Sequence, residues 1–147
     1  MAFKINIADK SGKTYKLEAE ADSLIDKELN QIINGKEIRE DLEGYEFEIA
    51  GASDKSGFTA LKSVEGVGLK KVLLTYGKGM HKKPKKEGKK KLSNNTPKGL
   101  RLRKTVRGKI ISSAIVQINL KVVRAGKKSL KDIFEPKTEE QPAEETQ

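Results

Sequence analysis

Two runs near the start of the chain alternate apolar and polar residues with a period of two. The turn-forming segment 9–12, Asp-Lys-Ser-Gly, separates these runs. The apolar positions are Phe3, Ile5, Ile7, Tyr15, Leu17 and Ala19. Alternation of this kind is typical of strands that bury one face, so the sequence predicts a β-hairpin over residues 3–19.

The next segment changes to a spacing that is typical of a helix. Asp22 or Ser23 can cap its start, and Asn34-Gly35 can end it. The apolar positions between these limits share one side: Leu24, Ile25, Leu29, Ile32 and Ile33. The sequence therefore predicts a short helix of about three turns.

Strand patterns return in the middle and near the end of the chain. Tyr45, Phe47 and Ile49 alternate ahead of a glycine-bounded loop at 51–57, and the apolar run 72–74 suits a strand covered on both sides. Residues 114–124 form a last strand, whose apolar face is Val116, Ile118, Leu120 and Val122. Because the pattern disappears from Gly77 to Lys104, we expect a long loop projecting from a compact β-rich body.

Charge is distributed unevenly along the 147 residues, which have a net charge of +10. Residues 1–54 hold 7 basic and 13 acidic side chains, whereas residues 78–109 hold 14 basic side chains and one acid, Glu87. Like charges at this density repel one another unless a polyanion neutralises them. The sequence therefore predicts a polyanionic partner for segment 78–109, which we call the basic stretch.

The order of residues within the basic stretch suggests two roles. Lysines come first, and the arginines Arg101, Arg103 and Arg107 follow beside the returning strand. Lysine is a compact charge that satisfies a phosphate from many directions, whereas arginine binds phosphates and guanine edges through a planar fork. We therefore expect a lysine-rich probe that follows a phosphate backbone and an arginine-bearing root that fixes its position.

The seven aromatic residues leave none between Gly77 and Ile133. The basic stretch therefore cannot stack unpaired bases, and we expect it to bind structured nucleic acid by backbone and shape. Alternatives are a solvated lysine-rich loop or a localisation signal, which short basic segments often are.

Other kinds of site have weak support. The chain has no cysteine and one histidine, His81, which cannot form a zinc cage alone and is better explained as a phosphate contact or a solvated side chain than as a general base. Segment 66–68, Gly-Val-Gly, resembles part of a phosphate-binding loop, but a turn is the better interpretation because the P-loop spacing is absent. No apolar run approaches the ~20 residues that span a bilayer, and no signal-peptide core is present, so we expect a cytoplasmic protein.

Five short motifs occur in an order that resembles a known family. They are D-K-S-G-F at 54–58, V-L-L ahead of G-K-G at 72–79, K-K-P-K-K-E-G at 82–88, K-T-V-R-G within R-K-T-V-R-G at 103–108, and Q-I-N-L-K-V at 117–122. The series resembles the archaeal and eukaryotic small-subunit ribosomal protein six, which is unrelated to the bacterial protein of that number. The resemblance covers about residues 1–134.

The resemblance implies a small β-barrel-like body on the ribosomal RNA of the small subunit, without cofactor or catalytic activity. Three local features depart from the family pattern: Thr59-Ala60 replace Pro-Met, Met80-His81 replace an aromatic, and 92–100 look like an insertion. The long basic C-terminal helix of eukaryotic members, with its regulatory serines, has no counterpart in the acidic segment 135–147.

The combined expectation is a mainly β protein that consists of a small β-barrel-like domain over 1–134 with one short helix, a projecting basic loop at 78–104 and a disordered acidic tail at 135–147. Its partners would be ribosomal RNA and neighbouring ribosomal proteins, with no membrane or small-molecule substrate. The expected RNA-binding residues are Lys55, Lys70, Lys71, Lys78, Lys82, Lys83, Lys85, Lys86, Lys89, Lys90, Lys91, Lys98, Arg101, Arg103, Lys104, Arg107, Lys109 and Lys121. The alternative function is a transient RNA chaperone or assembly factor; a processing enzyme would need a metal-binding carboxylate pair near the basic face, which the sequence lacks.

Overall fold

A computed structural model describes residues 2–83 and 98–134 of the chain. The predicted lysine probe from Lys85 onward, most of the 92–100 segment and the acidic tail therefore lie outside the described residues, whereas the first lysines of the probe, Lys78, Lys82 and Lys83, lie within them. The described part is mainly β, as the sequence predicts.

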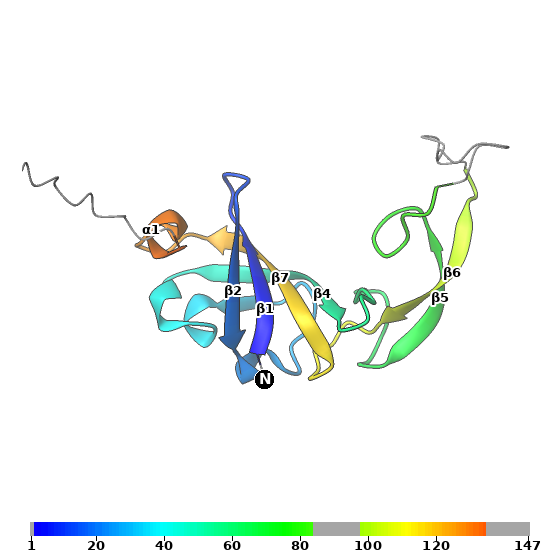
Figure 1. Cartoon of the computed structure of the whole chain (residues 1–147), viewed down its shortest axis with the longest axis horizontal. Helices are drawn as coiled ribbons and strands as arrows, with labels where there is room; N and C mark the ends of the chain where they lie inside the picture. Colours follow the sequence, from blue (N-terminus) through cyan, green and yellow to red (C-terminus); the bar gives the residue numbers. More distant parts are fainter. Residues whose placement is uncertain (1, 84–97, 135–147) are drawn as a thin grey trace, which may run out of the picture.

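Five strands form one sheet that curls into a half-barrel (Figure 1). Along the sheet the strand order is β2-β1-β7-β4-β3. The strands are β1 (Ala2–Ala8), β2 (Thr14–Glu20), β3 (Ile32–Asn34), β4 (Glu46–Asp54) and β7 (Ile115–Arg124). The first two form the predicted antiparallel hairpin, and β1 then pairs in parallel with β7.

The half-barrel encloses the main core. Alternate side chains of β1, β4 and β7 point inward, so that Ile5, Phe47 and Ile118 are fully buried. Tyr45 stacks on Phe47 with ring centroids 5.6 Å apart, and its hydroxyl donates a hydrogen bond to the Lys128 carbonyl. The period-two pattern of the sequence thus identifies the buried face of this sheet.

The helix predicted for 22–33 is wrong. Only a 3₁₀ turn, Asp22–Leu24, forms there, and two more 3₁₀ turns, Gly35–Glu37 and Glu40–Leu42, follow β3. The backbone amides of Asp26 and Leu29 donate to the carbonyls of Ile111 and Lys109 instead of to residues four positions earlier. These long-range hydrogen bonds outweigh a local helical preference, because an isolated three-turn helix is marginal in water. The one α-helix of the described chain is α1 (Leu130–Phe134), which packs against the same core.

Two further strands form a ribbon that projects from one side of the half-barrel (Figure 1). The ribbon consists of β5 (Leu69–Thr75) and β6 (Arg101–Arg107), paired antiparallel along their whole length. One face covers a small core of three buried residues, Leu61, Val64 and Val106. The other face is open, so the prediction that residues 72–74 would be covered on both sides is wrong: Leu73 is 50% exposed.

The ribbon also corrects two predicted loop boundaries. Residues 101–104 belong to β6, because they pair with β5, and are not part of a projecting loop. Residues 51–54 continue β4 beyond a bulge at Ala50, which shortens the predicted loop at 51–57 to the segment after Asp54. Isolated bridges from Thr59 to Ser53 and from Ala60 to Arg107 then connect the half-barrel to the ribbon.

Candidate nucleic-acid interface

The open face of the ribbon presents cationic side chains at alternate positions. Lys71, Arg101 and Arg103 are exposed and lie on this face, on the same side as Leu69 and Leu73. Arg103 is directly opposite Leu73, and Arg101 is opposite Thr75. Because both strands are held by their pairing, the backbone beneath these side chains is fixed before any ligand arrives. The ribbon is therefore a rigid support for forked, charged hydrogen-bond donors.

Neither strand of the ribbon contains an acidic residue that could neutralise these groups. Their sequences are L-K-K-V-L-L-T and R-L-R-K-T-V-R. The cationic residues of the ribbon are Lys70, Lys71, Arg101, Arg103, Lys104 and Arg107. The exposed members of this set give the ribbon an excess of positive charge, which attracts an anionic polymer.

Arg107 differs from the other ribbon arginines because it has a protein partner. Its Nε lies 2.9 Å from Asp54 Oδ2, and the two side chains are only 15% and 5% exposed. Burial alone would raise the pKa of the Asp54 carboxyl, but the hydrogen bond and charge of Arg107, together with the Phe58 amide, lower that pKa below its ordinary value. The pair joins β4 of the half-barrel to β6 of the ribbon.

Lys109, just beyond β6, also contacts acidic residues of the protein. Its Nζ lies 3.0 Å from Glu65 Oε2 and 3.1 Å from Glu28 Oε2. The hydrogen bonds from Lys109 to Glu65 and Glu28 raise the pKa of this lysine. Lys70 donates to the Glu65 carbonyl at 2.9 Å. The sequence separates these cations only into lysines and arginines, whereas the structure separates those that pair with protein groups from those that are open.

The segment after β5 begins with a tight turn. The Gly77 and Met80 backbones exchange hydrogen bonds of 2.9 and 3.0 Å, and the Met80 side chain is buried. Lys78 reaches back from this turn and donates to the Ala50 carbonyl of the half-barrel at 2.7 Å. His81 is exposed and makes an edge-on contact with the Tyr76 ring, at a centroid distance of 5.8 Å.

The remaining predicted RNA-binding residues fall into two groups. Six lie on the surface in the described parts of the chain: Lys55, Lys82, Lys83, Lys98, Lys104 and Lys121. Lys121 lies on β7 of the half-barrel, and so it is not part of the ribbon. Five lie in the masked range 84–97, outside the described residues: Lys85, Lys86, Lys89, Lys90 and Lys91.

Segment 66–68 is a bend that packs against another part of the backbone. The Gly66 and Gly68 carbonyls accept hydrogen bonds from the Ile110 and Gly108 amides. A Cβ on Gly108 would lie 1.8 Å from the Gly66 oxygen, so only glycine fits there. The segment thus turns carbonyls toward its neighbour and serves close packing rather than phosphate binding, as the turn interpretation predicts.

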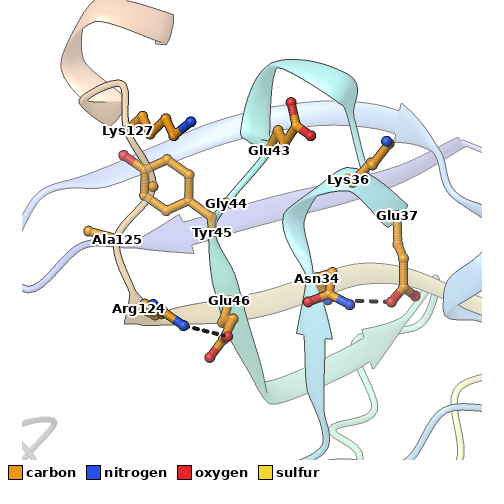
Figure 2. A pocket seen from close by; sticks show the side chains of 11 residues that line it. Asn34, Lys36, Glu37, Glu43, Gly44, Tyr45, Glu46, Arg124, Ala125 and Lys127 are labelled. Carbon is orange, nitrogen blue, oxygen red and sulfur yellow. Dashed lines mark hydrogen bonds and ion pairs between the residues drawn. The ribbon is translucent and has the colours of Figure 1, made fainter.

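A surface hollow lies in the half-barrel, between the end of β7 and the residues around β3 (Figure 2). It is lined by as many acids as bases, and Arg124 within it already lies 3.5 Å from Glu46. In the same wall, the Asn34 backbone amide donates a hydrogen bond of 3.4 Å to the Glu37 carboxylate (Figure 2). With its charges balanced, this hollow lacks the excess of cations that a phosphate site needs.

Within residues 2–83 and 98–134 no cluster of three or more histidine, cysteine or acidic side chains is arranged to hold a metal ion. In the same ranges no helix has the length and apolarity needed to cross a bilayer.

Comparison with known proteins identifies the family of this chain. A family model described as ribosomal protein S6e matches residues 3–135. The protein named small ribosomal subunit protein eS6 of Methanococcus maripaludis strain C6 is 40% identical over 127 residues, which are 86% of this chain and 90% of the relative. The proteins of the same name from Methanocaldococcus jannaschii and Archaeoglobus fulgidus are 39% and 38% identical, covering 89% and 95% of this chain and 89% and 100% of the relatives. The chain therefore belongs to the ribosomal protein S6e family.

Proposed function

We propose that this chain attaches to ribosomal RNA through phosphate contacts made by the open face of the β5–β6 ribbon and by the basic stretch. As a member of the S6e family it is a non-enzymatic, structural component of the small ribosomal subunit and works in the cytoplasmic ribosome. The proposal therefore concerns how the protein holds its RNA. Lys55 and Lys121 provide further contacts from the half-barrel.

The observation that carries the proposal is the row of open cations on a rigid ribbon without acids. Lys71, Arg101 and Arg103 are exposed, and no described protein group pairs with their charges. Phosphates are the natural partners, because each contact releases a condensed counterion from the nucleic acid. A-form RNA is recognised largely through its shape and its phosphates, which suits two strands that contain no aromatic residue.

The test is binding of a triple variant, Lys71→Ala/Arg101→Ala/Arg103→Ala, to a small-subunit ribosomal RNA transcript at several salt concentrations. We expect the slope of log affinity against log salt to fall by about two to three, since each lost contact removes about 0.7 to 0.9. The matched control, Lys10→Ala/Lys13→Ala/Lys36→Ala, removes three exposed lysines from the half-barrel. Equal slopes for the two triple variants would show that the ribbon is not the RNA-binding surface.

A second measurement separates a permanent component from a factor that binds transiently. Small subunits assembled with the parent protein are sedimented through high salt. We expect the protein to remain with the particle, because many phosphate contacts must break together before it can leave. Release at the salt concentration that removes assembly factors would favour the transient function.

A further inference from the structure

Three carboxamide side chains meet on the outer face of the half-barrel, where β1 and β7 lie side by side. Asn6 is opposite Asn119 in the parallel register, and Asn6 Nδ2 donates to Asn119 Oδ1 at 3.0 Å. Gln117 Nε2 donates to the same oxygen at 3.1 Å. We call Asn6, Gln117 and Asn119 the amide cluster.

The period of β7 explains how the amide cluster reaches the surface. Gln117 and Asn119 flank Ile118, which is fully buried, so that both amides project from the opposite side of the sheet. Exposed asparagine and glutamine side chains ordinarily rotate in solvent. Here the shared Asn119 oxygen fixes how the three amides face one another, and thereby reduces the conformational entropy that a ligand would have to remove.

A lysine of the basic stretch lies close to the cluster, over Gly51 of the neighbouring strand. Gly51 of β4 lies opposite Asn119 in the register. A Cβ built on Gly51 would lie 3.9 Å from Asn119 Nδ2 and 3.4 Å from Lys78 Nζ. Lys78 is the first residue of the basic stretch, so the amide cluster borders the segment that we propose binds RNA phosphates.

We propose that the amide cluster binds the edge of a nucleobase in the small-subunit ribosomal RNA, while Lys78 and Lys121 hold the adjoining phosphates. The inference rests on the proposed function, because it assumes that RNA lies along the basic stretch. Asn119 Nδ2, Gln117 Oε1 and Asn6 Oδ1 have no hydrogen-bond partner among the described residues. The Asn119 amide group can donate, and the Gln117 and Asn6 oxygens can accept. Carboxamide donors and acceptors of this kind match the adjacent donor and acceptor of an adenine edge.

The surroundings favour RNA over a protein partner. Lys16, Lys78 and Lys121 surround the amides. Two acids lie nearby: Glu18 is 3.8 Å from Lys4, and Glu48 is opposite Lys121 in the β4–β7 register, so cations exceed acids around the cluster. A protein interface would ordinarily have an apolar, aromatic centre. The amide cluster has neither, and its polar groups are the kind that specify a base after phosphate contacts have set the register.

The test compares two variants that change the charge of β7 equally and on the same face. Asn119→Asp keeps the oxygen that accepts from Asn6 and Gln117 but removes the free donors, whereas Lys121→Gln removes one positive charge and leaves the cluster intact. Affinity is measured for a small-subunit ribosomal RNA transcript and for a short random-sequence RNA duplex. We expect the two variants to bind the duplex alike, and Asn119→Asp to bind the transcript about 5- to 100-fold more weakly than Lys121→Gln.

Three outcomes decide the matter. Equal transcript affinities for Asn119→Asp and Lys121→Gln would overturn base recognition. Equal affinities together with poor incorporation of Asn119→Asp alone into small subunits would also overturn it, and would assign the cluster to a protein contact. Failure of the proposed function is seen separately, as parent-like transcript binding by the ribbon triple variant. Thermal unfolding of Asn119→Asp and of Lys121→Gln confirms that both remain folded.

Discussion

The half-barrel and the ribbon differ in how many apolar side chains they bury and in the sign of their charge. The half-barrel buries twenty apolar side chains in one core, and the first 54 residues, which form most of it, carry a net charge of −6. The ribbon covers three buried side chains, and its strand β6 lies within the basic stretch, whose net charge is +13. Burial of apolar surface therefore stabilises the half-barrel internally, whereas the ribbon depends on its attachment to the half-barrel and gains electrostatically only when an anionic partner is present.

The largest effect that separates the two regions is a core truncation. Phe47→Ala in the half-barrel should lower the free energy of unfolding by about 3–5 kcal/mol, because it removes a fully buried ring and leaves a cavity. Val106→Ala in the ribbon core should cost only about 1–2 kcal/mol. Urea unfolding of both variants measures the difference.

Hydrogen exchange then shows whether the two cores are distinct. In Val106→Ala the backbone amides of β5 and β6 should exchange faster, while those of β1 and β7 keep their parent protection. Equal loss of protection in both regions would mean that the ribbon and the half-barrel unfold as one unit.

The second effect concerns the ion pair that joins the two regions. Asp54→Ala leaves the largely buried Arg107 guanidinium without its carboxylate, and should destabilise the protein by about 3 kcal/mol. Ser53→Ala, at the neighbouring and partly exposed position, is the matched control and should change little. If the two variants unfolded at the same urea concentration, the ion pair would not be what fixes the ribbon to the half-barrel.

The same ion pair gives a pH dependence of known sign. The pKa of Asp54 is lowered from 3.8 in the folded protein, so folding favours the ionised carboxylate. This stabilisation is complete above the ordinary pKa and is lost as pH falls through the lower, folded-state pKa. Between about pH 4 and pH 2 the parent should therefore lose more unfolding free energy than Asp54→Asn. Equal losses of unfolding free energy in the parent and in Asp54→Asn would show that the Asp54–Arg107 ion pair does not cause this pH dependence.

The third effect is on RNA binding and contrasts two arginines of one strand. Arg103→Ala should weaken transcript binding by about 1–3 kcal/mol without changing stability, because its side chain is exposed. Lysine at position 103 should restore little of this loss, since it lacks the planar fork. Arg107→Lys should weaken binding as well, but together with a loss of stability, because Arg107 also supports Asp54. Affinity and urea unfolding of the same samples distinguish these cases.

The smallest effect belongs to single lysines of the basic stretch. Lys82→Ala should reduce the salt slope by about 0.9 or less and cost little affinity, because neighbouring lysines can neutralise the same phosphate. Lys10→Ala in the half-barrel is the control and should leave the slope unchanged. A loss for Lys82→Ala as large as that for Arg103→Ala would remove the distinction between arginine root and lysine probe.

Strands with clean alternation could be predicted from the sequence, and the segment 22–33 could not. Side chains of β1, and of β7 from Ile118 onward, alternate between core and solvent, so the apolar spacing indicates which side chains are buried. In segment 22–33 the apolar spacing fits a helix, but Asp26 and Asn30 adopt positive φ angles of 65° and 68°. Partners far along the chain impose those angles through hydrogen bonds, and a local pattern does not contain that information.

The candidate site also has features that could be predicted from the sequence and features that could not. The location of the cationic surface could be predicted, because charge density is a property of the sequence itself. The pairing of Arg107 with Asp54 could not, since the two residues are 53 positions apart and nothing local connects them. The outward position of two members of the amide cluster could have been predicted from the sequence, because Gln117 and Asn119 flank the apolar residue Ile118 in a strand.

The parallel pairing of β1 with β7 has a consequence for how the protein is made. The paired residues Asn6 and Asn119 are 113 positions apart, so β1 can pair with β7 only after almost all of the described chain has been synthesised. Until then the N-terminal hairpin is alone, and two strands by themselves are marginally stable in water. The basic stretch leaves the translating ribosome during this interval, ahead of β7. Each new copy is therefore strongly cationic before its body has closed, and we expect prompt capture by an RNA partner or a chaperone to protect it from aggregation.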